Sequence, residues 1–183
     1  MKHTRAAVFL LCVFAGCSDA GGPFQSPRID PGIGIDGVRI GYPRDKVRAI
    51  LGTPDGGGLW DGLWGGGVVD RWRTGPHAGL DVYYRDYFQG NTPYLGPADY
   101  IGVGPPFAGT TREGIGPGSR WESVLLAYPA PLHAAIDSAG SGSIVVCGSG
   151  RYTFYQFIDS AVWSVGTGYF DPPPPGALPY SCR

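Results

Sequence analysis

Two short segments of this chain place their apolar residues three and four positions apart, which is the spacing of one face of a helix. The first segment covers residues 43–51 and opens on Pro43, at a position where a helix tolerates a missing N–H. The second covers residues 120–128 and ends before another proline. We therefore predict a short helix in each segment, with Val47 and Val124 at equivalent buried positions.

After each predicted helix, β-branched and aromatic residues run in short stretches separated by glycine, which is typical of strands. The stretches cover residues 59–64, 68–73, 80–87, 100–104, 132–136, 143–147, 152–158 and 161–165. Side chains alternate between two sides in 152–158, so one face of the sheet is expected to be buried and the other exposed. The segment 85–97 is predicted to be a long loop.

The first helical segment and the residues before it recur later in the chain. At a constant offset of about 77 residues, Gly37 matches Gly114, Gly41 matches Gly118 and Val47 matches Val124. This repetition predicts an α+β fold of two tandem repeats, each a short helix followed by an antiparallel sheet of three to four strands. The first repeat is expected at residues 35–110 and the second at residues 111–170.

Residues 1–16 combine a basic start with an apolar run too short to span a bilayer, which is typical of a secretory signal peptide. The run ends in Phe14-Ala15-Gly16-Cys17, which resembles the lipobox of bacterial lipoproteins, although that family prefers leucine where Phe14 stands. The resemblance implies that Cys17 is acylated and becomes the new N-terminus. Because Ser18 follows the cysteine, it also implies sorting to the outer membrane, facing the periplasm. An ordinary signal peptide with a chance cysteine is the alternative.

Residues 17–34 are predicted to be a flexible tether between the lipid and the fold. If Cys17 is lipidated, Cys147 and Cys182 are the free thiols of the mature chain, and an oxidising envelope is expected to pair them in a disulfide bond. The bond would tie the proline-rich tail, residues 171–183, to the second repeat. No metal site is expected, because a third cysteine is missing and the histidines of the mature chain lie in different repeats.

The residues from Gly41 to the Leu-Gly-x-Pro sequence that ends at Pro54 resemble the α-then-β unit of two known families. These are the β-lactamase-inhibitor-protein fold and the small lipoprotein of the outer-membrane β-barrel assembly machine. The resemblance runs from about residue 33 to residue 170 and implies a protein-binding scaffold rather than a catalyst. It carries over no functional residue, because the matched positions are turn glycines and the buried face of a helix. In the second repeat Tyr128-Pro129 replaces Leu-Gly.

Composition narrows the classes of partner. The chain has 32 glycines and 18 prolines, only 16% of its residues are charged, and its net charge is −1. Such a balance supplies no basic field for nucleic acid or an anionic lipid surface, so no nucleic-acid partner is expected, and the membrane contact is expected through the lipid anchor. No cofactor is expected either, because Pro117 removes a backbone donor from the only segment that looks like a phosphate loop.

Catalysis is not expected. His77, Asp81 and Asp70 could in principle form an acid–base pair, but no nucleophile motif accompanies them. A small hydrolase is therefore the last of the functions that we weigh.

The surplus of aromatic residues favours binding, since rigid rings are common anchors at protein interfaces. Trp60, Trp64 and Tyr83 are the predicted binding residues, with core packing as the alternative for such rings. We expect an envelope protein as the partner. A peptidoglycan or glycan ligand that stacks on the same rings is the alternative.

Overall fold

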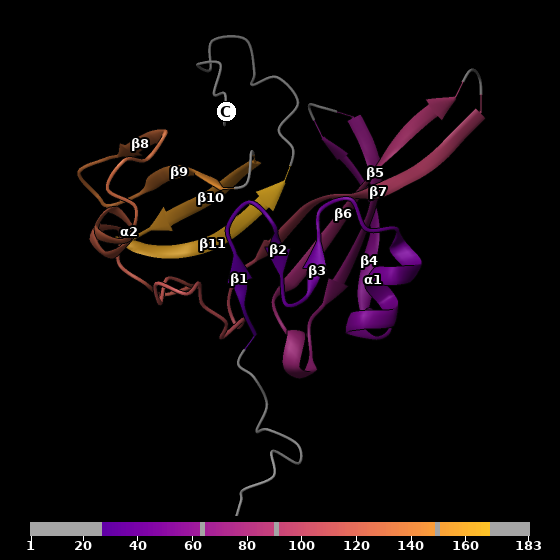
Figure 1. Ribbon diagram of the computed structural model, residues 1–183, viewed down its shortest axis with the longest axis horizontal. Helices are drawn as coiled ribbons and strands as arrows, with labels where there is room; N and C mark the ends of the chain where they lie inside the picture. The colour runs from indigo at the N-terminus through magenta and orange to yellow at the C-terminus, as the bar shows by residue number, and fades with distance from the viewer. Residues whose placement is uncertain (1–26, 63–64, 90–91, 149–150, 169–183) are drawn as a thin grey trace, which may run out of the picture.

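The computed structural model describes residues 27–62, 65–89, 92–148 and 151–168, which build two antiparallel sheets (Figure 1). The smaller sheet has three strands of two residues each, in chain order. They are β1 (Ile29–Asp30), β2 (Gly34–Ile35) and β3 (Val38–Arg39).

The larger sheet has eight strands in the order β4-β5-β6-β7-β11-β10-β9-β8. Their bounds are β4 (Gly56–Gly62), β5 (Gly65–Trp72), β6 (Leu80–Gln89), β7 (Thr92–Val103), β8 (His133–Ile136), β9 (Gly142–Gly148), β10 (Arg151–Ile158) and β11 (Ala161–Gly168). Each of the eight stretches predicted from the sequence overlaps one of these strands. The stretches of β-branched and aromatic residues therefore predicted the positions of these strands correctly.

Two α-helices are present among the described residues, α1 (Arg44–Leu51) and α2 (Trp121–Ala127), together with the 3-10 turn η1 (Gly75–His77). Their positions confirm the two predicted helices. Val47 and Val124 are both fully buried, as predicted. Each helix precedes four strands of the large sheet, α1 before β4–β7 and α2 before β8–β11.

The predicted fold class is nevertheless wrong. The described residues are mostly β, and they form one eight-stranded antiparallel sheet plus a three-stranded sheet rather than two helix-plus-sheet repeats. The reason is the pairing of β7 with β11, which runs from Val103↔Val165 to Tyr100↔Gly168. Strands from both halves of the chain thus share one ladder, and their buried side chains belong to one hydrophobic cluster.

The predicted loop at 85–97 is also wrong. β6 and β7 continue through this segment as a hairpin and pair as far as Gln89↔Thr92. The pairing shifts register twice, and β7 holds an extra residue at each shift. Pro97 lies within the second shift, between Leu95 and Ala98, where a strand accommodates a residue without an N–H.

Part of the predicted tether belongs to the fold. Ile29 is fully buried, and its N–H donates to the carbonyl of Thr110 at 3.0 Å. The N–H of Gly32 donates to Thr153 Oγ1 at 2.7 Å. The signal peptide, the rest of the tether and the proline-rich tail lie outside the described residues.

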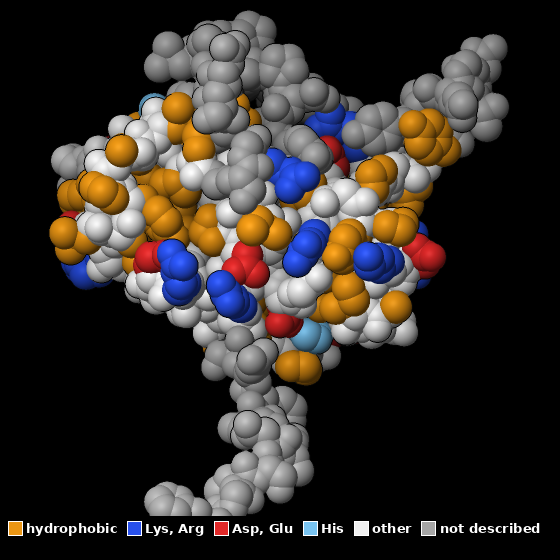
Figure 2. Space-filling view, viewed as in Figure 1, with side chains coloured by type: hydrophobic (Ala, Val, Ile, Leu, Met, Phe, Trp, Pro, Cys, Tyr) orange, Lys and Arg blue, Asp and Glu red, His pale blue; other side chains and the backbone are white. Residues whose placement is uncertain are grey.

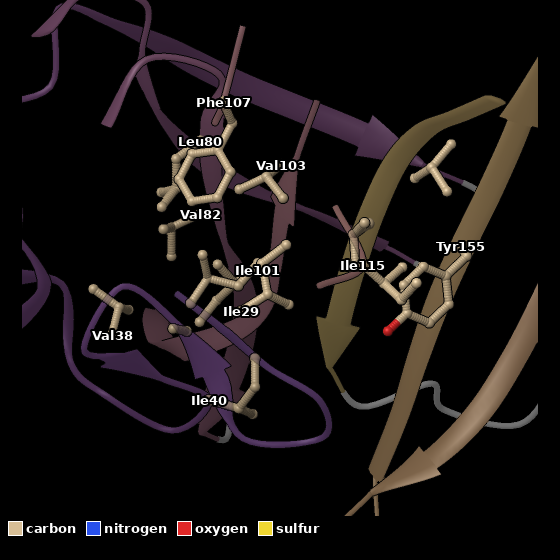
Figure 3. Packing of buried hydrophobic residues seen from close by; sticks show 14 of the residues in the cluster. Ile29, Val38, Ile40, Leu80, Val82, Ile101, Val103, Phe107, Ile115 and Tyr155 are labelled. Carbon is tan, nitrogen blue, oxygen red and sulfur yellow. The ribbon is translucent and has the colours of Figure 1, made fainter. Parts of the chain in front are cut away.

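One face of the large sheet, which we call the core side, packs against α1, α2 and the small sheet. Ile29 of β1 lies beside Ile101 of β7, and Phe107 lies over Leu80 and Val103 (Figure 3). Burial of these side chains is the main favourable contribution to folding. Seen from this side, basic and acidic side chains are interspersed over the outer surface (Figure 2).

The opposite face of the large sheet, which we call the open face, carries the side chains that alternate with the core-side ones. The pairing Tyr83↔Tyr100 places these two residues on it, and the neighbouring pair Val82↔Ile101 points to the core side. Among the described residues, neither α-helix nor the small sheet lies on the open face. Side chains on this face range from fully buried, as at Val69, to exposed, as at Trp163.

Candidate binding site on the open face

Three aromatic rings lie side by side on the open face. Trp60 of β4 meets Tyr83 of β6 edge to face, with ring centroids 5.8 Å apart and an interplanar angle of 83°. Tyr83 meets Tyr100 of β7 at 5.5 Å and 65°. All three are half-buried, so each keeps part of its surface for contact. Of the predicted binding residues, the structure brings Trp60 and Tyr83 together, whereas Trp64 lies outside the described residues.

Tyr100 packs against glycines of two neighbouring strands. A Cβ atom at Gly102 of β7 or at Gly166 of β11 would collide with its ring. These glycines therefore make room for the ring, in the way that aromatic side chains cover glycines across a sheet. Burial raises the pKa of Tyr100, and the nearby Tyr83 and Asp81 add to the rise. Its hydroxyl therefore stays protonated at physiological pH.

Beside Tyr100 the open face forms a shallow hollow of about 390 Å³. Tyr83 and Tyr100 line it together with Gly102 of β7, and Trp163 of β11 lines it from the next strand. The β10–β11 pairing shifts register between Gln156 and Phe157, and Trp163 is the additional residue of β11 at this bulge. Its side chain is 53% exposed, an unusual position for so large an apolar surface.

An ion-pair cluster borders the hollow. Arg73 donates two hydrogen bonds to Asp81, at 2.6 and 3.1 Å, and Nε of Arg71 lies 3.6 Å from the same carboxylate. The hydrogen bonds that Arg73 donates to Asp81 raise the pKa of Arg73, so the guanidinium is charged throughout the pH range of the folded protein. Two guanidinium groups share this carboxylate, and the nearby carboxylate of Asp55 also interacts electrostatically with Arg73. The charges of this cluster therefore balance, and Arg73 offers the hollow guanidinium N–H donors rather than a net positive charge.

Gln156 of β10 and Ser164 of β11 add neutral polar groups. Ser164 Oγ donates to Oε1 of Gln156 at 2.7 Å, and both side chains line the hollow. This hydrogen bond fixes the amide oxygen and leaves the amide N–H groups of Gln156 as donors. The hollow thus combines aromatic surface, the Arg73–Asp81 ion pair and an amide donor.

The acid–base pair considered from the sequence is not assembled. His77 pairs with Asp36 of the turn between β2 and β3. Asp70 lies on the core side and binds Arg44 and Arg48, whereas Asp81 lies on the open face. The three side chains of that hypothesis therefore have separate partners.

The remaining sequence predictions are tested only in part. Cys147 on β9 takes part in a disulfide bond, but no other cysteine is among the described residues, so its pairing with Cys182 stays a prediction, as does lipidation of Cys17. Within the described ranges no group of three or more His, Cys, Asp or Glu side chains could hold a metal ion. No helix of the described part of the chain is long and apolar enough to cross a membrane.

Tyr100, Trp163 and Gln156 were missed as binding residues. Tyr100 looked like one more strand residue, and its position against Gly166 depends on the β7–β11 pairing, which joins distant parts of the chain. Trp163 faces the hollow only because of a bulge. The one available signal was the single large aromatic residue in 161–166.

Comparisons of the chain with protein-family models, with curated proteins and with solved structures find no match. The resemblance to the β-lactamase-inhibitor-protein fold and to the assembly-machine lipoprotein therefore stays a prediction. What the protein binds has to be inferred from the chemistry of the open face.

Proposed function

We propose that this protein is a lipid-anchored envelope protein that binds a partner protein on the open face of its large sheet. The hollow beside Tyr100 is the observation that supports the proposal. It joins half-buried rings, an exposed tryptophan and the guanidinium of Arg73 on a face that no described helix covers.

The chemistry of the hollow favours one kind of contact. Rigid rings give a protein interface a large contact area at a small entropy cost, and a few such residues supply most of the binding free energy. Trp163 and Tyr83 can hold an apolar side chain of the partner, while Arg73 stands where a carboxylate could bind. We therefore expect the partner to present an apolar residue next to an acidic one.

The binding proposal is tested by capture from detergent-solubilised envelopes with the full chain as bait. The double change Trp163→Ala and Tyr83→Ala should lose a partner that the wild type retains, because both rings leave the hollow. Leu126→Ala is the matched control, since Leu126 is an exposed residue of α2, away from the open face. Thermal unfolding of each variant checks that the fold is kept. If the double variant captures as much of the partner as the wild type does, the open face is not the binding surface.

The anchor is a separate part of the proposal. Replacement of Cys17 by alanine should leave the protein in the soluble periplasmic fraction or as an uncleaved precursor, because the acyl chains have no other attachment site. Normal processing and membrane fractionation of Cys17→Ala would refute lipid anchoring without affecting the binding proposal.

A glycan ligand is the second candidate, and the exposed indole of Trp163 beside the amide of Gln156 is the observation that favours it. Sugars stack on exposed rings and bond to neighbouring amides. Peptidoglycan fragments should then change the tryptophan fluorescence of the wild type but not that of Trp163→Ala. A protein partner captured without any such response would favour the first proposal.

A further inference from the structure

A second surface of the large sheet lies at its free edge, on β4. This strand pairs with β5 on one side, and no described strand pairs with its other side. Proteins usually protect such edges with lysine, proline or a covering segment, because the unpaired backbone groups attract another strand. β4 reads Gly-Gly-Gly-Leu-Trp-Asp-Gly; it contains neither lysine nor proline, and Asp61 is its one charged residue. Leu59 in its middle is 85% exposed.

The fold does not require all the glycines of this edge. Gly57 has φ 147°, in the region that favours glycine, and a Cβ there would collide with the backbone of Val69. At Gly58, by contrast, a Cβ would meet nothing within 4 Å, and φ is not in that region. Glycine inside a strand lowers the stability of the fold relative to alanine. The described part of the chain therefore does not require glycine at position 58. A glycine there does allow the backbone of another chain to approach closely.

A hollow of about 470 Å³ lies next to this edge on the core side, and its lining includes Leu59, Val68 and two arginines of α1. Arg44 and Arg48 each donate two hydrogen bonds to the buried carboxylate of Asp70, from Nε and Nη2 at 2.6 to 2.9 Å. Each guanidinium has five N–H donors, so three of each remain for other acceptors. The arginine side chains are 32% and 40% exposed.

The surroundings of the arginines favour an acidic group. One carboxylate, Asp70, is shared by two guanidinium groups. The other acidic residue of the lining, Asp55, accepts hydrogen bonds from the N–H groups of Arg73 and Thr74 and from Thr74 Oγ1, so its oxygens are directed to that turn. Tyr84, whose ring centroid lies 5.8 Å from Arg44 Cζ, is fully buried, and its hydroxyl has no hydrogen-bond partner among the described residues.

We propose that the free edge of β4 binds an extended, acidic segment of a partner protein. The segment adds to the large sheet as a ninth strand, with backbone hydrogen bonds to β4, and one of its aspartate or glutamate side chains lies in the hollow against Arg44 and Arg48. Arg44 and Arg48 provide the preference for an acidic residue. The unpaired backbone groups of β4 provide most of the affinity. This surface is separate from the hollow on the open face.

Selection of a displayed library of random decapeptides on the full chain tests the proposal. Enriched peptides should share an acidic residue among β-forming neighbours, and replacing that residue by its amide should weaken binding about tenfold. Leu59→Glu should weaken binding at least as much, because it places a carboxylate at the mouth of the hollow. Leu126→Glu is the matched control, since Leu126 is 84% exposed on α2; it should leave the affinity unchanged.

Hydrogen exchange in the presence of a selected peptide locates the contact. Amides of β4 should exchange more slowly, whereas those of β8 at the other edge should not change. Selection without an acidic preference, equal effects of the two glutamate variants, or protection at β8 would overturn the proposal. Dimers of the chain with β4 protected in the absence of peptide would assign the edge to a second copy instead. Trp163→Ala should keep the peptide affinity, so failure of this proposal and failure of the open-face proposal are distinguishable.

Discussion

Asp70 is a carboxylate buried on the core side between two arginines of α1. Burial works to raise its pKa, but the hydrogen bonds and charges of Arg44 and Arg48 outweigh burial and hold the pKa of Asp70 below its usual value. The ionised form is thus favoured in the folded protein. The cluster also ties α1 to β5, since its members come from these two elements.

Asp70→Asn should lower the free energy of unfolding by about 2 kcal/mol at neutral pH, because it leaves two partly buried arginines without their carboxylate. Urea denaturation measures the change. Glu122→Gln is the control, since its ion pair with Arg120 is exposed and should contribute nothing measurable. Equal stability of Asp70→Asn and wild type would show that the cluster does not hold α1.

The effect of Asp70 should depend on pH. A carboxyl group whose pKa is lower in the folded than in the unfolded state stabilises the protein above its unfolded pKa, which is about 3.9. That stability is lost as the pH falls through the lower, folded pKa. The difference between wild type and Asp70→Asn should therefore be constant above about pH 5 and shrink below about pH 4. A difference that does not change between these ranges would contradict the assignment.

Val47 of α1 and Val124 of α2 are both fully buried on the inner faces of their helices. Val47→Ala and Val124→Ala should therefore each lower the free energy of unfolding by about 1–3 kcal/mol, through lost burial and incomplete collapse of the cavity. Ile50→Ala on α1 should change it far less, because Ile50 is exposed. Chemical denaturation of the three variants compares them. A loss at Ile50 as large as at Val47 would contradict the predicted face of α1.

At the scale of elements, the sequence predicted the helices and the strands but not how the strands pair. Helical spacing and β-branched stretches are local signals, and the elements that they predict are present in the structure. The hairpin at 85–97 was missed because its glycines and prolines indicate a loop, whereas Pro97 lies at a bulge of β7 and Pro93 pairs with Phe88 near the end of the hairpin. The β7–β11 pairing could not be predicted, since it joins residues about 60 positions apart through contacts that no local pattern records.

Gly166 tests this joint between the two halves of the sheet. Gly166→Ala should lower the free energy of unfolding by about 1–3 kcal/mol, because the new Cβ collides with the ring of Tyr100 and forces it to move. It should also weaken binding on the open face. Gly58→Ala, where the Cβ meets open space, is the control and should cause no loss. If Gly166→Ala is as stable as Gly58→Ala in urea denaturation, Tyr100 does not pack on β11.

At the scale of the whole molecule, the sequence predicted the aromatic character of the open face but not the hollow on it. Its aromatic character was predicted from Trp60 and Tyr83, and these rings do meet. The hollow is lined by residues of both halves of the chain, such as Arg73 in the first half and Ser164 in the second. It exists only because one sheet spans both halves. A prediction of two separate sheets could not place Trp163 beside Tyr100.

The central claim is that the open face is the surface that holds a partner. The most direct measurement is site-specific photo-crosslinking in intact cells, with a photoreactive amino acid in place of Trp163 in one variant and of Leu126 in another. Both positions are exposed, but Trp163 lies at the hollow and Leu126 on α2. The account predicts a discrete adduct with one envelope protein from position 163 and none from position 126. An adduct from position 126 alone, or no adduct from position 163, would contradict it.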